Sequence, residues 1–399
     1  MTAQEAQPAA VAELPAAVRA DPLATATPVV AEPQMLRWVR RGVVAGVIAV
    51  AAMLPFFASR FWLNVALFVT IAAIGGLGLN VLSGYTGQVS LGHAFFLAIG
   101  AYTGGVLGYD HKVDALLWLP AAGVVAAGFG LIVGPTALRL RGLYLSIVTI
   151  GLVFIGQHIW SNVDWLAGGP AGRFFPALVV GGVDTARQQT VAGVALSTDA
   201  MDFYVAAVVL GLCMVFVHNV ARTRLGRAMQ AVREREIAAA IMGVDLARTK
   251  LSAFVISSFI TGLAGGLYGV ALGYAVPGTW DLVLSIEFVA IIIVGGVGTV
   301  WGALLGALFI GALPKVLDQY ADSLPFIHGG ATGSGLAAGD AAAIAYGLLI
   351  VLFLLFEPHG VMGLVGRLWR AISRRLAGTT PTPPARPVAN RTTVEESSA

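Results

Sequence analysis

The chain has 399 residues, of which 57% are hydrophobic and 11% are charged, and its formal net charge is +3. Soluble domains carry roughly 25% charged residues, so this composition excludes a chain that lies mostly in water. Continuous apolar stretches of about 20 residues, the length of a helix that crosses a bilayer, exclude a β-barrel and predict an all-α polytopic membrane protein.

Residues 1–35, which are rich in Ala, Pro and Glu, predict a disordered N-terminal arm. This arm lacks the basic start and apolar core of a cleavable signal peptide. The membrane domain is expected over residues 36–366. Residues 367–399 are basic and then rich in Pro and Thr, and they are expected to form a tail.

Apolar runs within the membrane domain predict about ten transmembrane helices. Their expected bounds are 42–58, 62–80, 93–109, 115–137, 143–160, 201–219, 251–272, 282–297, 300–318 and 341–356. An even number of spans places both termini on one side. Most of the 24 Lys/Arg residues then lie on that side, which the positive-inside rule assigns to the cytoplasm.

Polar residues and glycines interrupt the apolar run from Gly75 to Gly105. Such interruption at membrane depth occurs where a segment lines a cavity or is buried in protein, and discontinuous helices form substrate sites in transporters. The pattern therefore favours a broken or re-entrant element over a short cytoplasmic loop. We expect its polar side chains to line a substrate path: Asn80, Ser83, Tyr85, Thr86, Gln88, Ser90 and His93. His93 alone is more typical of a structural histidine.

The expected cytoplasmic loop over 220–250 concentrates charge between two apolar spans. Its apolar residues recur at helical spacing and predict a short amphipathic helix that ends at Gly243, which suits a helix C-terminus because it has no Cβ. Two interpretations of this helix stay open. It lies on anionic lipid, or it is the element through which a cytoplasmic partner moves the membrane domain.

Glu287 stands out near the start of the eighth expected span. A carboxylate there is costly unless it is paired, neutralised or hydrated, so Glu287 is a candidate for the substrate path or for an interfacial ion pair. Pairs of glycines spaced four apart predict close contacts between helices. These pairs are Gly100/Gly104, Gly262/Gly266 and Gly302/Gly306.

Three of these segments resemble the permease subunits of branched-chain amino acid ABC importers, the LivM type. Gly75–Gly105 resembles the family's N-terminal signature, and the glycines that follow Glu287 resemble its C-terminal one. Gly226–Ser257 resembles its ATPase-contacting loop. The resemblance, which covers about residues 60–366, implies that the residues coupled to the ATPase are Arg233, Glu236, Ala238, Ala239 and Gly243.

The resemblance also implies partners and location. A second homologous permease, two cytoplasmic ABC ATPase subunits, an extracytoplasmic solute-binding protein and membrane lipid are expected, and no nucleic acid. ATP and magnesium would bind the ATPase subunits, whereas this chain would bind no cofactor or metal and would not be an enzyme. The sequence agrees, because it has no phosphate-binding G-x-x-x-x-G-K-[ST] motif. The expected location is the bacterial cytoplasmic (inner) membrane.

The substrate is the least specified part of this prediction. The resemblance implies a branched-chain or similar small amino acid, but permeases with the same signatures carry urea, short amides or aromatic acids. An ion-coupled secondary transporter is a further alternative. That class usually places ionisable residues at span centres, which here are almost free of them.

Overall fold

The structure, a computed structural model, describes residues 34–139, 142–185, 189–191, 194–320, 327–328, 336–357 and 360–376. The chain divides into two compact units, residues 1–49 and 50–399. Helix α1 (Gln34–Phe57) begins in the first unit, and all other described elements belong to the second. The predicted disordered arm lies outside the described residues except for its end, as does the predicted tail beyond Leu376.

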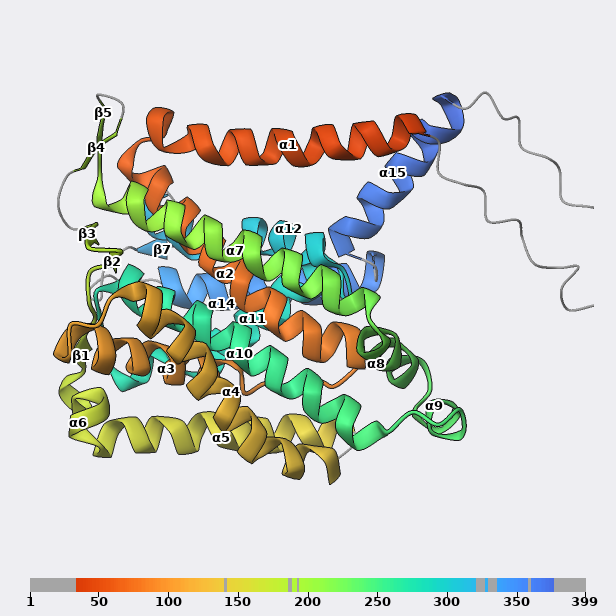
Figure 1. Cartoon of the computed structure of the whole chain (residues 1–399), viewed down its shortest axis with the longest axis horizontal. Coiled ribbons are helices and arrows are strands. Elements are labelled where there is room, and N and C mark those ends of the chain that lie inside the picture. Colours follow the sequence, from red (N-terminus) through yellow and green to blue (C-terminus); the bar gives the residue numbers. More distant parts are fainter. Residues whose placement is uncertain are drawn as a thin grey trace, which may run out of the picture. The chain divides into compact units, whose positions relative to one another are not determined.

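Helices form most of the second unit (Figure 1). The longer ones are α2 (Arg60–Leu79), α3 (His93–Gly104), α4 (Ala115–Arg139), α5 (Leu143–Asn162), α7 (Thr198–Arg222), α10 (Leu246–Leu272), α11 (Leu282–Gly295), α12 (Val300–Ile310) and α14 (Ala338–Phe356). π-Helical turns η2 (Asn80–Tyr85) and η3 (Gly105–Asp110) continue α2 and α3. The shorter helices are α6 (Asp164–Ala167), α8 (Arg224–Glu234), α9 (Glu236–Ile241), α13 (Leu313–Tyr320) and α15 (Gly360–Leu376).

Within the described residues, 7 helical segments are long and apolar enough to cross a membrane. They are Arg60–Tyr85, Ala115–Thr136, Tyr144–Asn162, Thr198–Arg222, Leu246–Leu272, Pro277–Gly295 and Val300–Tyr320. Each matches an expected span, which confirms the all-α polytopic class. The other expected spans, 42–58, 93–109 and 341–356, coincide with α1, α3–η3 and α14, whose apolar stretches are shorter. The count of ten stays a prediction.

Helix α2 forms the centre of the core. In its apolar window 94% of the residues are buried, against 33% in α4, in α5 and in the α12–α13 segment. Its inward residues pack against α10, α11, α12 and α7. Because α2 is enclosed by other helices, its apolar side chains serve packing, whereas α4 and α5 keep a broad outer face.

Several glycines let helices cross at backbone distance. A Cβ at Gly262 would lie 2.7 Å from the carbonyl oxygen of Ala122, and one at Gly302 would lie 2.5 Å from that of Gly296. Gly100 on α3 lies against the backbone of Gly262 on α10, and Gly306 against that of Ile291 on α11. Contacts of this kind replace side-chain interdigitation in membrane helices, and they confirm the prediction for these glycine pairs.

The second unit has two polar ends. Figure 1 shows α8 and α9 at one end, called here the loop end, and most of the strands at the other, called here the strand end. The strands pair as β1 (Arg173–Phe174) with β6 (Tyr274–Ala275), β2 (Val179–Val180) with β3 (Val183–Asp184), β4 (Gln189–Val191) with β5 (Val194–Leu196), and β7 (Ile327–His328) with β8 (Leu336–Ala337). Short 3-10 turns η4 (Gly169–Ala171) and η5 (Pro277–Thr279) flank β1 and β6.

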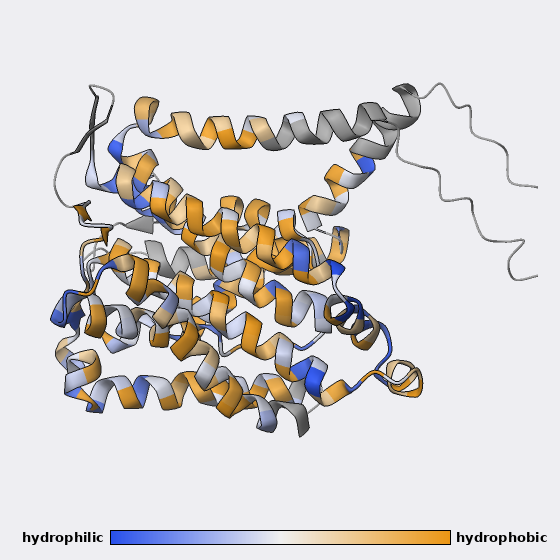
Figure 2. Cartoon of the chain, in the orientation of Figure 1, coloured by the Kyte–Doolittle hydropathy of each residue, from blue (hydrophilic) through white to orange (hydrophobic). Residues whose placement is uncertain are grey.

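The sides of the helices between the two ends are apolar. Figure 2 shows hydrophobic residues along these helices and hydrophilic ones gathered toward the ends. Many large apolar side chains point outward, including Ile132 on α4, Ile147 on α5 and Leu212 on α7. Exposed apolar surface on this scale fits contact with lipid or with other membrane helices.

Candidate functional site

The charged loop folds as two short helices rather than the single helix that the sequence predicts. Thr223 caps α8, its hydroxyl oxygen accepting a hydrogen bond from the N–H of Gly226 at 3.3 Å. Arg235 is extended, with φ −155° and ψ 107°, so it ends α8 and precedes the first turn of α9. The apolar spacing does not reveal this break, because the buried residues of α8 (Met229 and Val232) and of α9 (Ala239) continue one helical pattern across it.

Gly243 ends α9, as its sequence position predicts. Its φ is +83°, a left-handed conformation that favours glycine. The N–H of Gly243 donates to Ala240 O at 3.0 Å, and that of Val244 donates to Ala239 O at 3.0 Å. These two bonds form a Schellman motif, which satisfies the last carbonyls of the helix and turns the chain toward α10.

An ion pair fastens α9 to the membrane helices. Lys250 Nζ on α10 lies 2.6 Å from Glu236 Oε1. The Lys250 side chain is 7% exposed and that of Glu236 is 33% exposed, so the bond is largely shielded from water. Motion of α9 is therefore linked to the start of α10.

The tip of α9 carries exposed apolar side chains. Ile237, Ile241 and Met242 are 74%, 80% and 83% exposed. Ala238 beside them is exposed as well, whereas Ala239 is buried. An exposed apolar cluster on an otherwise charged loop is typical of contact with another protein or with a membrane.

Arg233 connects α8 to two segments of the membrane core. Its guanidinium donates a hydrogen bond to the carbonyl oxygen of Gly84 in η2. It also lies directly against Gly298, in the turn between α11 and α12, where φ is +86°. The contact spans 149 residues of sequence, from α8 to Gly84.

Asn80 joins the same turn to α2. The N–H of Gly298 donates to Asn80 Oδ1 at 2.7 Å, and Asn80 Nδ2 donates to the carbonyl oxygen of Thr299 at 2.9 Å. A Cβ at Gly84 would overlap the Asn80 amide and lie 2.7 Å from the nitrogen of Gly298. We call Asn80, Gly84, Arg233, Gly298 and Thr299 the junction. It leaves no room for an added methyl group at Gly84.

The polar residues that follow Asn80 form internal hydrogen bonds. Ser83 Oγ donates to Gln88 O at 2.9 Å, and Thr86 Oγ1 donates to Leu82 O at 2.6 Å. Gln88 Nε2 donates to Thr86 Oγ1 at 3.0 Å. Residues 87–92 are not helical, and they return the chain from η2 to the start of α3. These hydrogen bonds hold residues 82–88 in their conformation. That these residues line a substrate path stays a prediction.

The start of α3 lies deep in the core. The His93 ring packs on Phe288 with ring centroids 4.6 Å apart, and His93 Nε2 is buried with no hydrogen-bond partner among the described residues. The N–H of Ala94 donates to Ser285 Oγ at 3.0 Å. Ser90 Oγ accepts a bond from the N–H of Gly92 at 3.4 Å, and Tyr85 is buried in the core cluster. Helix α3 is thus held against α11 from its first turn.

Glu287 follows Ser285 by two residues and lies in the wall of a cavity of about 280 Å³. Helices α2, α10, α11 and α13 form this cavity, and Lys315 and Asp318 of α13 are among its polar side chains. Glu287 therefore lies apart from the polar segment of η2, although both were predicted for one path. Lys315 was not predicted, and its position within an expected span is the signal that could have found it.

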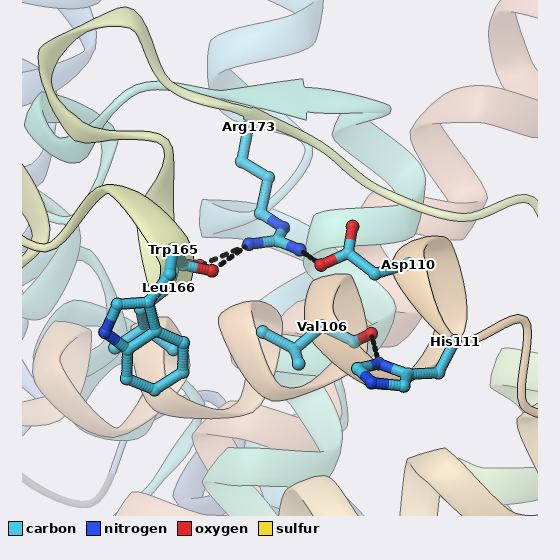
Figure 3. Close-up of polar contacts among 6 residues, drawn as sticks. All are labelled: Val106, Asp110, His111, Trp165, Leu166 and Arg173. Carbon is cyan, nitrogen blue, oxygen red and sulfur yellow. Dashed lines mark hydrogen bonds and ion pairs between the residues drawn. The ribbon is translucent and has the colours of Figure 1, made fainter.

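A network at the strand end holds its loops together. Figure 3 shows the Arg173 guanidinium between Asp110, at the end of η3, and the carbonyl oxygens of Trp165 and Leu166, each 2.8 Å from Nη1. His111 Nδ1 lies 2.9 Å from Val106 O nearby. β1–β6 pairing adds a link to the end of α10. The sequence does not predict this role of Arg173, because its charged partner Asp110 lies 63 residues away in the chain.

Asp114 joins the same end to α4. The N–H of Leu116 donates to its Oδ1 at 2.8 Å, and that of Gly182 donates to its Oδ2 at 3.1 Å. These backbone bonds, that of Leu116 first, hold the pKa of the Asp114 carboxyl below its usual range.

Comparison with known proteins decides the family. Residues 61–356 match the family described as branched-chain amino acid transport system / permease component. The chain belongs to this family. Its members include relatives named high-affinity branched-chain amino acid transport system permease protein LivM, from Escherichia coli K12 (32% identical) and Salmonella typhimurium LT2 (31% identical), each match covering 79% of this chain and 73% of the relative. No solved structure matches the chain.

A more distant relative from Pseudomonas aeruginosa, named as the permease protein BraD of the same kind of system, is 27% identical over 73% of this chain and 91% of its own length. The chain is thus a permease subunit of an ABC importer and a multi-pass protein of the inner membrane. The family region begins in α2 and ends at the last residue of α14. Helices α1 and α15 lie outside it.

Three groups of residues in this permease were found only in the structure. They are Lys250, which holds Glu236; the apolar cluster at the tip of α9; and Lys315 in the cavity wall. Lys250 could have been suspected, because it is one of only three lysines and follows the charged loop. The exposure of Ile237, Ile241 and Met242 could not, because isoleucine and methionine are ordinarily core residues.

Proposed function

We propose that this permease carries branched-chain amino acids or similarly small amino acids into the cell, driven by separate ATPase subunits that bind α9. The relatives named for branched-chain amino acid transport support the substrate class. The observation that carries the coupling is the exposed apolar tip of α9, tied by Lys250 and Arg233 to the membrane core. Urea, short amides and aromatic acids are the alternative solutes.

In this proposal α9 inserts into a cytoplasmic ATPase subunit. ATP and magnesium bind that subunit and not this chain. The residues in contact are Glu236, Ala238, Ala239 and Gly243, together with the apolar tip, and Arg233 passes motion on to the junction. Because Arg233 reaches both η2 and the α11–α12 turn, a shift of α8 moves the ends of two core segments together.

The ATPase can drive transport only by binding two arrangements of the permease with different affinities. The junction supports such a two-state element. Its members are held by hydrogen bonds between side chains and backbone, which re-form in a new register more readily than an interlocked apolar core. The polar segment from Asn80 to His93 and the cavity at Glu287 then lie along the route that opens and closes.

Ten spans, with both termini in the cytoplasm, agree with the contacts at the two ends. At the strand end, Arg60 Nε lies 3.0 Å from Asp199 Oδ2, which joins the starts of α2 and α7, and β1–β6 pairing joins the end of α10. The loop end gathers the ends of α7 and η2 and the α11–α12 turn. Placing the loop end in the cytoplasm makes α1, α3–η3 and α14 the remaining spans.

The non-helical segment 87–92, followed by α3, fits a broken helical element in this arrangement, with α3–η3 completing the span. Helix α3 has 12 residues, a length of about 18 Å, roughly half of a bilayer core of about 30 Å. Helix α3 begins against Phe288, which packs beside Gly75 on α2. A Cβ added at Gly75 would lie 3.0 Å from Phe288 Cζ. Non-helical backbone at that depth requires burial in protein, which the surrounding helices provide.

The expected partners are a second homologous permease, two ABC ATPase subunits and an extracytoplasmic solute-binding protein. Purification of the tagged chain in mild detergent, followed by mass spectrometry, tests them. Recovery of a P-loop ATPase and a second permease is the expected result. Reconstituted uptake of L-leucine that needs ATP and the binding protein then tests the substrate, whereas uptake driven by a proton or sodium gradient without an ATPase would support a secondary transporter.

Gly243 offers a sharper test of coupling. Gly243→Leu forces a left-handed conformation on a branched residue and places bulk at the tip, so we expect lost ATPase binding with intact solute capture by the binding protein. Asn tolerates the same backbone conformation, which makes Gly243→Asn the matched control. Normal ATP-driven uptake by the Leu variant would count against the assignment of α9.

A further inference from the structure

The cavity at Glu287 carries opposite charges that, among the described residues, are not joined in an ion pair. Within the described part of the chain, the Glu287 carboxylate forms no hydrogen bond or ion pair. Lys315 Nζ lies over the ring of Phe68, 4.1 Å from its centroid. Asp318 follows one turn later on α13 and is exposed. Charges placed in membrane spans are costly, so residues of this kind mark solute or ion routes.

The remaining wall is apolar. Phe68, Leu272 and Phe288 come from three different helices and face the same space. A volume of about 280 Å³ is just below the range of roughly 300–1,000 Å³ for sites that hold drug-sized ligands. The cavity therefore fits a small solute with an acidic group, a basic group and an apolar part.

We propose that this cavity is a transient binding site for zwitterionic amino acids with a short aliphatic side chain, with Glu287 as partner of the ammonium group and Lys315 as partner of the carboxylate. The inference rests on the proposed function and specifies where and how the solute is recognised. A zwitterion offers a partner to Glu287 and to Lys315 at once, whereas a simple carboxylate offers none to Glu287 and a simple amine offers none to Lys315. Urea and short amides carry no charge to do either.

The aliphatic side chain would rest on the apolar wall. Burying such a side chain contributes about 1.5–3 kcal/mol when it is complete, and less here because one side of the cavity is open. The site must also release its solute to let it pass, which requires weak binding. Selection among amino acids with different side chains is then left to the solute-binding protein.

Uptake of L-leucine by the reconstituted complex tests the two charges. Glu287→Gln and Lys315→Met are each expected to lower ATP-driven uptake on the order of 10- to 100-fold, the effect of losing one hydrogen bond to a charged group. Asp202→Asn is the control for the carboxylate, because Asp202 lies in α7 and accepts a bond from Thr185 Oγ1 at 2.9 Å. Lys112→Met is the control for the lysine, because Lys112 is exposed and lies outside the cavity wall. Both controls should stay within about twofold of the wild type.

The outcomes separate the inference from the function on which it rests. A wild-type complex that takes up no leucine contradicts the proposed substrate. A wild type that does, together with a Glu287→Gln complex that assembles and transports equally well, overturns the site.

A cysteine experiment decides the case in which Glu287→Gln fails to assemble. The chain has a single cysteine, Cys213, so Asp318→Cys in a Cys213→Ser chain places one thiol at the mouth of the cavity. Millimolar L-leucine should slow its reaction with a cationic methanethiosulfonate in the purified complex. 4-Methylpentanoate and 3-methylbutylamine, which each lack one of the charges, should not. Equal protection by all three, or none by leucine, overturns the proposal.

Discussion

Helix α11 passes through two regions of opposite character. At its loop end, the junction is filled: Asn80 bonds both Gly298 and Thr299, and an added Cβ at Gly84 has no space. About two turns away, Glu287 faces a cavity of about 280 Å³ and, among the described residues, forms no hydrogen bond or ion pair there. The filled junction suits the transmission of displacement between helices, and the cavity suits transient binding of a solute. Stability should therefore depend on the junction, and solute handling on the cavity.

The largest effect is expected for Gly84→Ala. The new methyl group would overlap the Asn80 amide and press on the Gly298 nitrogen, and overpacking of this kind costs about 1–3 kcal/mol or more. Thermal unfolding of the purified complex should show a clear fall in midpoint together with loss of uptake. Gly128→Ala is the control, because an added Cβ there meets no atom within 4 Å among the described residues.

Asn80→Leu should follow closely. It leaves the Gly298 N–H and the Thr299 carbonyl without their partner, and because both groups are only part-buried, each loss should cost less than the roughly 1–3 kcal/mol of a fully buried group. Asn80→Asp keeps the acceptor for Gly298 but loses the donor to Thr299, so it should fall between the wild type and the Leu variant. Equal midpoints for all three proteins would show that the amide does not brace the turn.

Arg233→Met should have a moderate effect on stability, about 1 kcal/mol, because Arg233 is exposed apart from its contacts with Gly84 and Gly298. Its effect on coupling should be larger: ATP hydrolysis continues while uptake falls. Arg227→Met is the matched control for Arg233→Met. Arg227 lies on the same helix, but it donates its hydrogen bond to Arg222 O within the loop and not to the membrane core. Parallel measurement of hydrolysis and uptake distinguishes the two arginines, and a coupled Arg233→Met complex would remove Arg233 from the pathway.

Glu287→Gln should have the smallest effect on stability, and its sign should differ from the others. Neutralising a carboxylate without an internal partner removes a desolvation cost, so the unfolding midpoint should stay the same or rise slightly. Functional sites commonly carry such a cost. A marked fall in midpoint would mean that Glu287 holds the helices together and that the contrast between the two regions fails.

The sequence by itself determined the class of this protein. Apolar runs of bilayer length, the glycine pairs and the charged loop that ends at Gly243 are local patterns, and hydropathy and helical spacing report local structure directly. The Schellman turn at Gly243 and the close contacts of Gly262 and Gly302 follow from them. The specific motifs also led to the family.

Only the tertiary structure decided which residues meet. Arg233 and Gly84 are 149 residues apart, and Asn80 and Gly298 are 218 apart, so no periodicity relates them. The split of the charged loop at Arg235 and the pairing of Glu236 with Lys250 depend on where α10 lies. The cavity likewise arises where four helices leave space between them, and the approach of Glu287 and Lys315 to one cavity becomes visible only once those helices are placed.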